Sequence, residues 1–160
     1  MKNYSFVPDV MFENALDIEP DFLTAKGIRA VVLDIDNTLV TYGVAEPTEE
    51  VIAWIDSLKA AGLGVAIASN NHAPRVELFN QKIGVFATCE SKKPSSKAVK
   101  AACDHFGLKP EETAVIGDQI FTDVWCARNA GALAILVKPI PYPENLFFKC
   151  KRVIEKFPFC

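Results

Sequence analysis

Residues 31–38 read VVLDIDNT, an apolar run that ends in two carboxylates, Asp34 and Asp36, with one apolar residue between them. A continuous Val and Leu run without polar alternation is typical of a strand that is covered on both faces of a sheet. The carboxylates therefore lie at the carboxyl end of this strand, where open α/β sheets bind their ligands. Two like charges this close together require a cation or a proton between them. The segment predicts a ligand site at one edge of a sheet.

Strand-like and helix-like stretches alternate along the rest of the chain. Apolar runs predict buried strands over residues 30–33, 63–68, 113–116 and 133–137, and a shorter strand over residues 85–87. Helical patterns lie between them, each followed by a glycine, over residues 51–58, 74–83, 95–106 and 120–130. Short connections between such elements specify a doubly wound, three-layer, Rossmann-like parallel sheet with right-handed crossovers. We therefore expect an α/β fold.

Length and composition limit the class of protein. The 160 residues, 50% of them hydrophobic, suit one domain with a well-formed core. A net charge of −3 gives no basic surface of the kind that a dedicated nucleic-acid binder needs, so no nucleic-acid partner is expected. Neither a signal peptide nor a long apolar span is apparent, and the five cysteines lack C-x-x-C spacing. These features favour a cytoplasmic protein.

Polar groups follow three further predicted strands. Ser69-Asn70-Asn71 places a hydroxyl and amide donors beside a helix N-terminus, which favours anions such as phosphate. Lys92-Lys93-Pro94 places a lysine before a proline that opens the next helix. The segment GDQIFTD, residues 117–123, adds Asp118 at a strand tip and Asp123 about one helical turn later. All of these groups should gather on one rim of the sheet.

The order of these motifs resembles the haloacid dehalogenase superfamily of aspartate-nucleophile phosphotransferases. DIDNT matches the D-x-D-x-T motif, Ser69 the second-motif Ser/Thr, Lys93 the conserved lysine, and GDQIFTD the G-D-x4-D motif, all within residues 30–138. The chain is also similar to the small YqeG-like phosphatases of subclass IIIA. This similarity rests on DIDNTLV, SNN, KKP and GDQIFTDV together, with an N-terminal LTAKGIRAVV. The resemblance implies a phosphoric monoester hydrolase.

The same resemblance implies roles for the two motif aspartates and a metal. Asp34 would attack phosphorus to form an aspartyl-phosphate, and Asp36 would act as general acid and base on the leaving oxygen and the attacking water. A Mg²⁺ ion would be held by the carboxylates of Asp34 and Asp118 and by the backbone carbonyl of Asp36. This metal would keep Asp34 from repelling a phosphorylated substrate.

Supporting roles follow for the other motif residues. Ser69, Asn70 and Lys93 would bind the phosphoryl oxygens. Asp123 would orient the water shell of the metal or Lys93, and Thr38 would tie down the loop of the first motif. Three alternatives stay open: Ser69 as a helix cap, Lys93 in an ordinary surface turn, and Asp123 as a structural cap or ion pair. The two histidines have no metal-ligand spacing and receive no role.

The intervals between motifs leave no room for a separate cap domain, so the site should be open and suit a bulky phosphate ester, such as a lipid head group, or a small metabolite. We expect one domain, with an N-terminal segment over residues 1–29, a catalytic core over residues 30–138 and a C-terminal amphipathic helix over residues 139–160. The apolar stripe of that helix could pack on the core, on an anionic membrane surface or on another subunit.

By the resemblance to YqeG-like proteins, phosphatidylglycerophosphate is the first candidate substrate. The alternative from another class is a phosphate-responsive binding or regulatory protein with negligible turnover.

Overall fold

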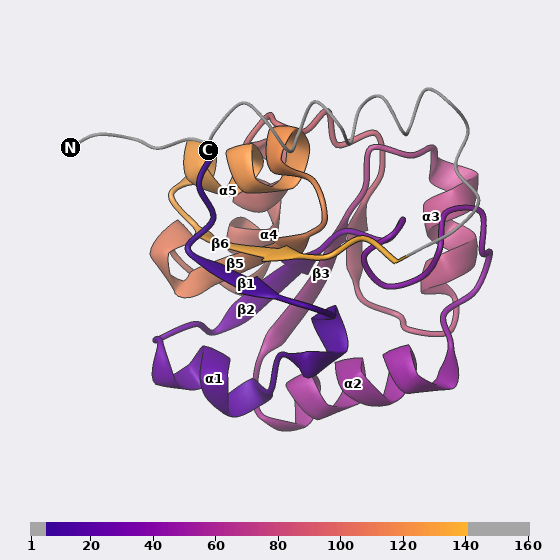
Figure 1. Cartoon of the computed structure of the whole chain (residues 1–160), viewed down its shortest axis with the longest axis horizontal. Coiled ribbons are helices and arrows are strands. Elements are labelled where there is room, and N and C mark those ends of the chain that lie inside the picture. The colour runs from indigo at the N-terminus through magenta and orange to yellow at the C-terminus, as the bar shows by residue number, and fades with distance from the viewer. Residues whose placement is uncertain (1–5, 141–160) are drawn as a thin grey trace.

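The computed structural model describes residues 6–140, which form a six-stranded sheet with helices on both faces (Figure 1). The strand order is β1-β6-β5-β2-β3-β4, and every neighbouring pair is parallel. The strands are β1 (Val10–Phe12), β2 (Ala30–Leu33), β3 (Gly64–Ala68), β4 (Phe86–Thr88), β5 (Thr113–Gly117) and β6 (Leu133–Val137). The helices are α1 (Pro20–Ala25), α2 (Glu49–Ala60), α3 (Ala73–Asn80), α4 (Lys97–Phe106) and α5 (Trp125–Ala130). The predicted α/β fold is confirmed.

Strand β2 occupies the middle of the sheet, between β5 and β3. Its four residues are all buried, as the continuous apolar run predicts for a strand covered on both faces. From β2 the chain adds β3 and β4 on one side and then crosses to add β5 and β6 on the other. The strand order therefore reverses beside β2, and open α/β sheets bind ligands at the carboxyl ends of the strands at such a point.

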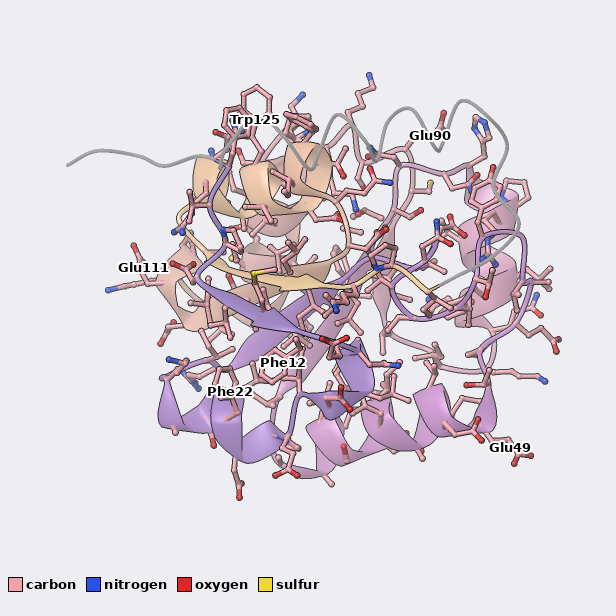
Figure 2. The ribbon with its side chains drawn as sticks, in the orientation of Figure 1. Phe12, Phe22, Glu49, Glu90, Glu111 and Trp125 are labelled. Carbon is pink, nitrogen blue, oxygen red and sulfur yellow. The ribbon has the colours of Figure 1, made fainter. Side chains whose placement is uncertain are left out.

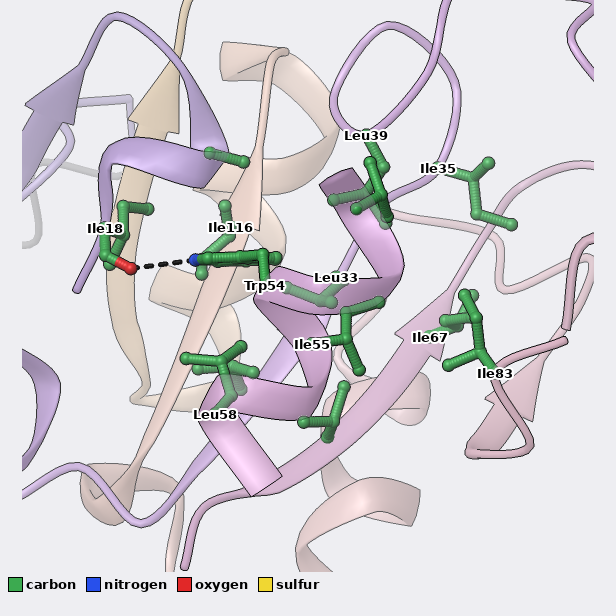
Figure 3. Close-up of a cluster of buried hydrophobic side chains, with 14 of the residues drawn as sticks. Ile18, Leu33, Ile35, Leu39, Trp54, Ile55, Leu58, Ile67, Ile83 and Ile116 are labelled. Carbon is green, nitrogen blue, oxygen red and sulfur yellow. Dashed lines mark hydrogen bonds between the residues drawn. The ribbon is translucent and has the colours of Figure 1, made fainter. Parts of the chain in front are cut away.

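Two separate hydrophobic clusters fill the space between the layers. One cluster joins one face of the sheet, the lower face in Figure 1, to α2, α3 and the N-terminal elements, and the other joins the opposite face to α4 and α5. In the first cluster the ring of Trp54 lies among buried aliphatic side chains, and its Nε1 donates a hydrogen bond of 2.9 Å to the Ile18 carbonyl oxygen (Figure 3). The Trp54 hydrogen bond ties α2 to the chain segment that precedes α1.

The N-terminal segment forms a strand, β1, that no sequence pattern predicts. β1 pairs with β6, and Asp9 fixes this edge by accepting a hydrogen bond from the Ala134 N–H at 2.8 Å and pairing with Arg128 at 2.9 Å. Phe12 packs edge-on against Phe22 of α1, with ring centroids 5.2 Å apart (Figure 2). A three-residue strand is too short to show a periodic pattern, so only the tertiary pairing reveals it.

The other predicted elements differ only in their ends, with one exception. The helix expected over residues 120–130 begins with a π-helical turn, Ile120–Val124, before α5, and 3₁₀ turns cover Ala15–Asp17 and Pro110–Glu112. Between β2 and α2 there is a loop, and between β3 and β4 there is α3, so residues 6–140 contain no cap domain. None of the helices in this range is long and apolar enough to cross a membrane. Of the C-terminal amphipathic helix predicted over residues 139–160, residues 141–160 lie outside the described residues.

Candidate active site

Side chains that follow β2, β3, β4 and β5 meet around one cavity of about 310 Å³. Because the strands are parallel, their carboxyl ends lie at the same edge of the sheet. Every lining residue carries a polar side-chain group; the residues are Asp34, Asp36, Asn37, Tyr42, Ser69, Asn70, Asn71, His72, Lys93, Gln119 and Thr122. The prediction that the polar motifs share one rim is confirmed.

A cluster of three carboxylates and one ammonium group lies at the end of β2. Asp34, Asp118 and Asp123 each place a carboxylate oxygen within 4.8 Å of the others. The buried Lys93 Nζ reaches into this cluster, 3.1 Å from Asp34 Oδ1 and 2.7 Å from Asp123 Oδ1. Lys93 is only 7% exposed, so the alternative of an ordinary surface turn is wrong.

The electrostatics of the cluster follow from its burial and its excess of acid. Burial, the charge of Asp123 and the charge of Asp118 raise the pKa of Asp34 well above its ordinary value, and the nearby Lys93 ammonium only partly offsets them. The charges of Asp123 and Asp34 raise the pKa of Lys93 despite its burial, so the ammonium stays charged. One lysine charge faces three carboxylates. Oxygen ligands with a residual negative charge fit a hard divalent cation.

The tight turn after β2 is built from its own backbone and from Thr38. The Asn37 N–H donates to the Val40 carbonyl oxygen at 2.7 Å, and Asn37 takes the left-handed conformation, with φ of 63°. This turn brings the Thr38 hydroxyl within 3.3 Å of Asp34 Oδ2 and 3.2 Å of Asp118 Oδ1. A hydroxyl has one proton to donate, so Thr38 can serve one of these carboxylates at a time. Thr38 thus links the first motif to the end of β5.

The contacts of Asp123 show why the last residue of β5, Gly117, is a glycine. Asp123 stands on the π-helical turn and accepts a hydrogen bond from the Gln119 N–H at 3.1 Å, so its carboxylate folds back toward β5. A Cβ atom on Gly117 would overlap the Asp123 side chain. Gly117 is therefore needed for the close approach that lets Asp123 meet Lys93. The ion-pair alternative for Asp123 matches this geometry.

Residues after β3 connect the second motif to the third. Ser69 is buried, and its Oγ accepts a hydrogen bond from the Asn71 N–H at 3.0 Å. The Asn70 amide bridges to the Lys93 backbone, accepting from its N–H at 2.8 Å and donating to its carbonyl oxygen at 3.3 Å. Helix α3 has His72 as its N-cap, without a side-chain cap bond, so the capping alternative for Ser69 is wrong. The Asn70 bridge fixes the backbone that carries Lys93.

Asp36 also lines the cavity, and two side-chain donors hold its carboxylate. Asn71 Nδ2 donates to Asp36 Oδ2 at 3.2 Å, and Arg75 Nη2 donates to Asp36 Oδ1 at 2.9 Å. Sequence reasoning gave Arg75 no role. The available signal was its position in the first turn of the helix after Ser69-Asn70-Asn71, where a long side chain can reach back to the strand ends. His72, also without a predicted role, lines the cavity rim 3.6 Å from Glu90.

Comparisons with known proteins identify the family of the chain. A family model for haloacid dehalogenase-like hydrolases matches residues 42–131, more than half of the chain. The probable phosphatase YqeG of Bacillus subtilis is 34% identical over 151 residues, which cover 94% of this chain and 88% of that protein. Phosphatidylglycerophosphate phosphatase 1, chloroplastic/mitochondrial, of Arabidopsis thaliana is 26% identical over 92% of this chain, but the match spans only 45% of the plant protein.

A solved structure shares the fold. The cobalt-bound deoxy-D-mannose-octulosonate 8-phosphate phosphatase of Haemophilus influenzae superposes with a TM-score of 0.57 at 18% identity, over 79% of this chain and 75% of the other. The aspartate-lined edge of the parallel sheet, the matching family model and the extended similarity to YqeG lead to one assignment. The chain belongs to the haloacid dehalogenase-like hydrolases and is a YqeG-like phosphatase of that superfamily.

Proposed function

We propose that this phosphatase hydrolyses phosphomonoesters with Mg²⁺ through an aspartyl-phosphate on Asp34. The observation that carries the proposal is the placement of Asp34 in the cavity, beside Lys93 and within a cluster of carboxylates. The attacking Asp34 oxygen forms a bond to phosphorus while the bond from phosphorus to the ester oxygen breaks. Asp36 supplies the proton that the leaving oxygen needs. The first half-reaction thus releases an alcohol.

In the second half-reaction Asp36 takes a proton from water, and the resulting hydroxide attacks phosphorus. The bond between phosphorus and Asp34 breaks, which regenerates the carboxylate and releases inorganic phosphate. Lys93 and Ser69 offer an ammonium and a hydroxyl to the phosphoryl oxygens as charge develops on them. Asp123 keeps Lys93 in place through the 2.7 Å ion pair. The proton that Asp36 gives in the first step is thereby restored in the second.

Asp34 and Asp118 would hold the Mg²⁺ ion with their carboxylates, together with the Asp36 backbone carbonyl. The three neighbouring carboxylates support this assignment, since one lysine leaves the cluster negatively charged. A bound Mg²⁺ ion supplies positive charge that lets an anionic phosphate approach an anionic nucleophile.

For the substrate we propose a bulky phosphate ester, with phosphatidylglycerophosphate first. The cavity opens without a cap domain in residues 6–140, so a large leaving group can remain outside while its phosphate enters. Tyr42 on the cavity lining and Val44 on the same loop are 45% and 40% exposed, and they offer apolar contact beside the entrance. The similarity to the Arabidopsis phosphatidylglycerophosphate phosphatase supports the same choice. Contact of the C-terminal residues 139–160 with a membrane, or with a second subunit, belongs to this proposal.

Phosphate release from a panel of phosphomonoesters tests the proposal. The panel contains phosphatidylglycerophosphate in mixed micelles, glycerol phosphate and p-nitrophenyl phosphate, each with Mg²⁺ or EDTA. We expect Mg²⁺-dependent release that Asp34→Asn abolishes, while the matched control Asp56→Asn, on the exposed side of α2, keeps full activity. Release that survives EDTA or Asp34→Asn would contradict the mechanism, and release from none of the panel would favour a binding protein.

A further inference from the structure

We propose that Arg75 is a positioning residue that aims the Asp36 carboxylate at the reacting oxygen. This inference rests on the proposed role of Asp36 as general acid and base. Arg75 stands in the first turn of α3, and its Nη2 donates to Asp36 Oδ1 at 2.9 Å. The two side chains are 15% and 17% exposed, so solvent screens this pair much less than an ordinary surface pair.

The approach of Arg75 leaves the cavity side of Asp36 free for substrate. Asp36 and Asn71 both line the cavity, whereas Arg75 is not among its lining residues. The guanidinium therefore contacts one carboxylate oxygen without lining the cavity, while the Asn71 amide, which does line it, contacts the second carboxylate oxygen at 3.2 Å. Two donors from one segment, four residues apart, leave Asp36 little freedom to rotate. A general acid needs such orientation, because proton transfer requires hydrogen-bond geometry to the leaving oxygen.

Arg75 is itself fixed by the surrounding structure. Its Nη1 donates to the Ala45 carbonyl oxygen at 3.1 Å, and its guanidinium lies over the Phe79 ring at 5.5 Å from the centroid. The remaining Nε is buried and has no hydrogen-bond partner among the described residues. A buried donor left unpaired costs free energy. Arg75 retains the Asp36 and Ala45 contacts despite that cost, as expected for a side chain whose position serves the site.

The contact with Ala45 gives Arg75 a second effect. Ala45 belongs to the loop between β2 and α2, which also carries Tyr42 on the cavity lining. Arg75 therefore connects three parts of the site: the helix after β3, the acid of the first motif and the loop at the entrance. A planar guanidinium with several donors can make these contacts at once, and a lysine ammonium has neither the fork nor the ring-stacking surface.

Leaving-group dependence separates positioning of a general acid from a structural role. An alkyl oxygen leaves poorly without a proton, whereas p-nitrophenolate leaves readily, so a misplaced Asp36 matters mainly for alkyl phosphates. We expect Arg75→Met to lower kcat about 100-fold for an alkyl phosphate that the wild type cleaves, with KM little changed. For p-nitrophenyl phosphate the loss should stay below about 5-fold. Arg75→Lys should recover part of the alkyl activity and provides the readout if Arg75→Met fails to fold.

Two further measurements complete the test. Adding Arg75→Met to Asp36→Asn should cost little further kcat on the alkyl phosphate, because the two residues act as one unit. The control Arg29→Met removes an exposed arginine paired with Glu112 at 3.5 Å and should leave both activities unchanged. Equal loss on both substrates, or a rise in KM alone, would overturn the positioning role while the proposed function stands. A wild type that cleaves neither substrate would overturn the proposed function itself.

Discussion

Replacing Lys93 by methionine should destabilise the metal-free protein strongly, because it leaves the buried Asp123 carboxylate and the largely buried Asp34 carboxylate without their cation. The ammonium lies 3.1 Å from Asp34 Oδ1 and 2.7 Å from Asp123 Oδ1, and the Lys93 side chain is 3% exposed. Breaking a buried ion pair by removing one partner costs about 3–5 kcal/mol. With a urea m-value of about 1–3 kcal/mol/M, the unfolding midpoint should fall by about 1 M or more.

The control for this substitution is Lys82→Met. The Lys82 Nζ lies 3.1 Å from Glu46 Oε2, the same distance as Lys93 Nζ from Asp34 Oδ1. The side chains of Lys82 and Glu46, however, are 54% and 53% exposed. An exposed pair contributes about 0–1 kcal/mol, so this variant should unfold close to the wild-type midpoint. The two variants share the Lys→Met change and a 3.1 Å ion pair, and they differ in burial and in the second carboxylate, Asp123, that only Lys93 contacts.

Urea unfolding followed by circular dichroism in EDTA at pH 7 measures both variants. Adding Asp123→Asn to Lys93→Met should regain stability, because it removes one of the uncompensated charges. The reasoning would be refuted if Lys93→Met lost no more stability than Lys82→Met, or if the double variant were less stable than Lys93→Met alone.

The remaining predictions concern the same cluster. In EDTA at pH 7, the Asp34→Asn variant should unfold at a higher urea concentration than the wild type. The pKa of Asp34 is higher in the folded protein than in the unfolded chain, so ionisation of this carboxyl at pH 7 favours the unfolded chain. Asparagine does not ionise and removes that cost. This gain in unfolding free energy should vanish below about pH 4, where Asp34 is protonated in both states, and a gain that is constant with pH would contradict the electrostatic cause. Adding Mg²⁺ should stabilise the wild type more than the variant. Gly117→Ala should cost about 1–3 kcal/mol through overlap with Asp123 and should reduce phosphate release. Combining it with Asp123→Ala should cost less than the sum of the two single changes, and strict additivity of the unfolding free energies would exclude the overlap.

Most of the fold could be predicted because its signals are local. Residues 30–33 form β2 as the apolar run predicts, and the helices α2, α3 and α4 lie within a few residues of their expected ranges. β1 could not be predicted, since three residues with an exposed Met11 carry no period, and their pairing with β6 joins segments far apart in the chain. The π-helical turn that carries Asp123 also escaped prediction, because it depends on the space that Gly117 leaves.

The candidate site, like the fold, could be predicted only in part. The order of motifs was enough to predict that Asp34, Ser69, Lys93 and Asp118 share one rim, because parallel strands bring their carboxyl ends together whatever the details of packing. Which group touches which was decided by the tertiary structure.

By itself, then, the sequence determined the α/β class, the edge of the sheet where the chemistry lies and the residue types that carry it, since periodicity and strand-end position depend on near neighbours in the chain. The tertiary structure alone decided that Lys93 pairs with Asp123, and that Arg75 holds Asp36 and reaches Ala45. These contacts join residues about 30 or more positions apart, and distances of a few ångströms between such residues depend on how whole elements pack against one another.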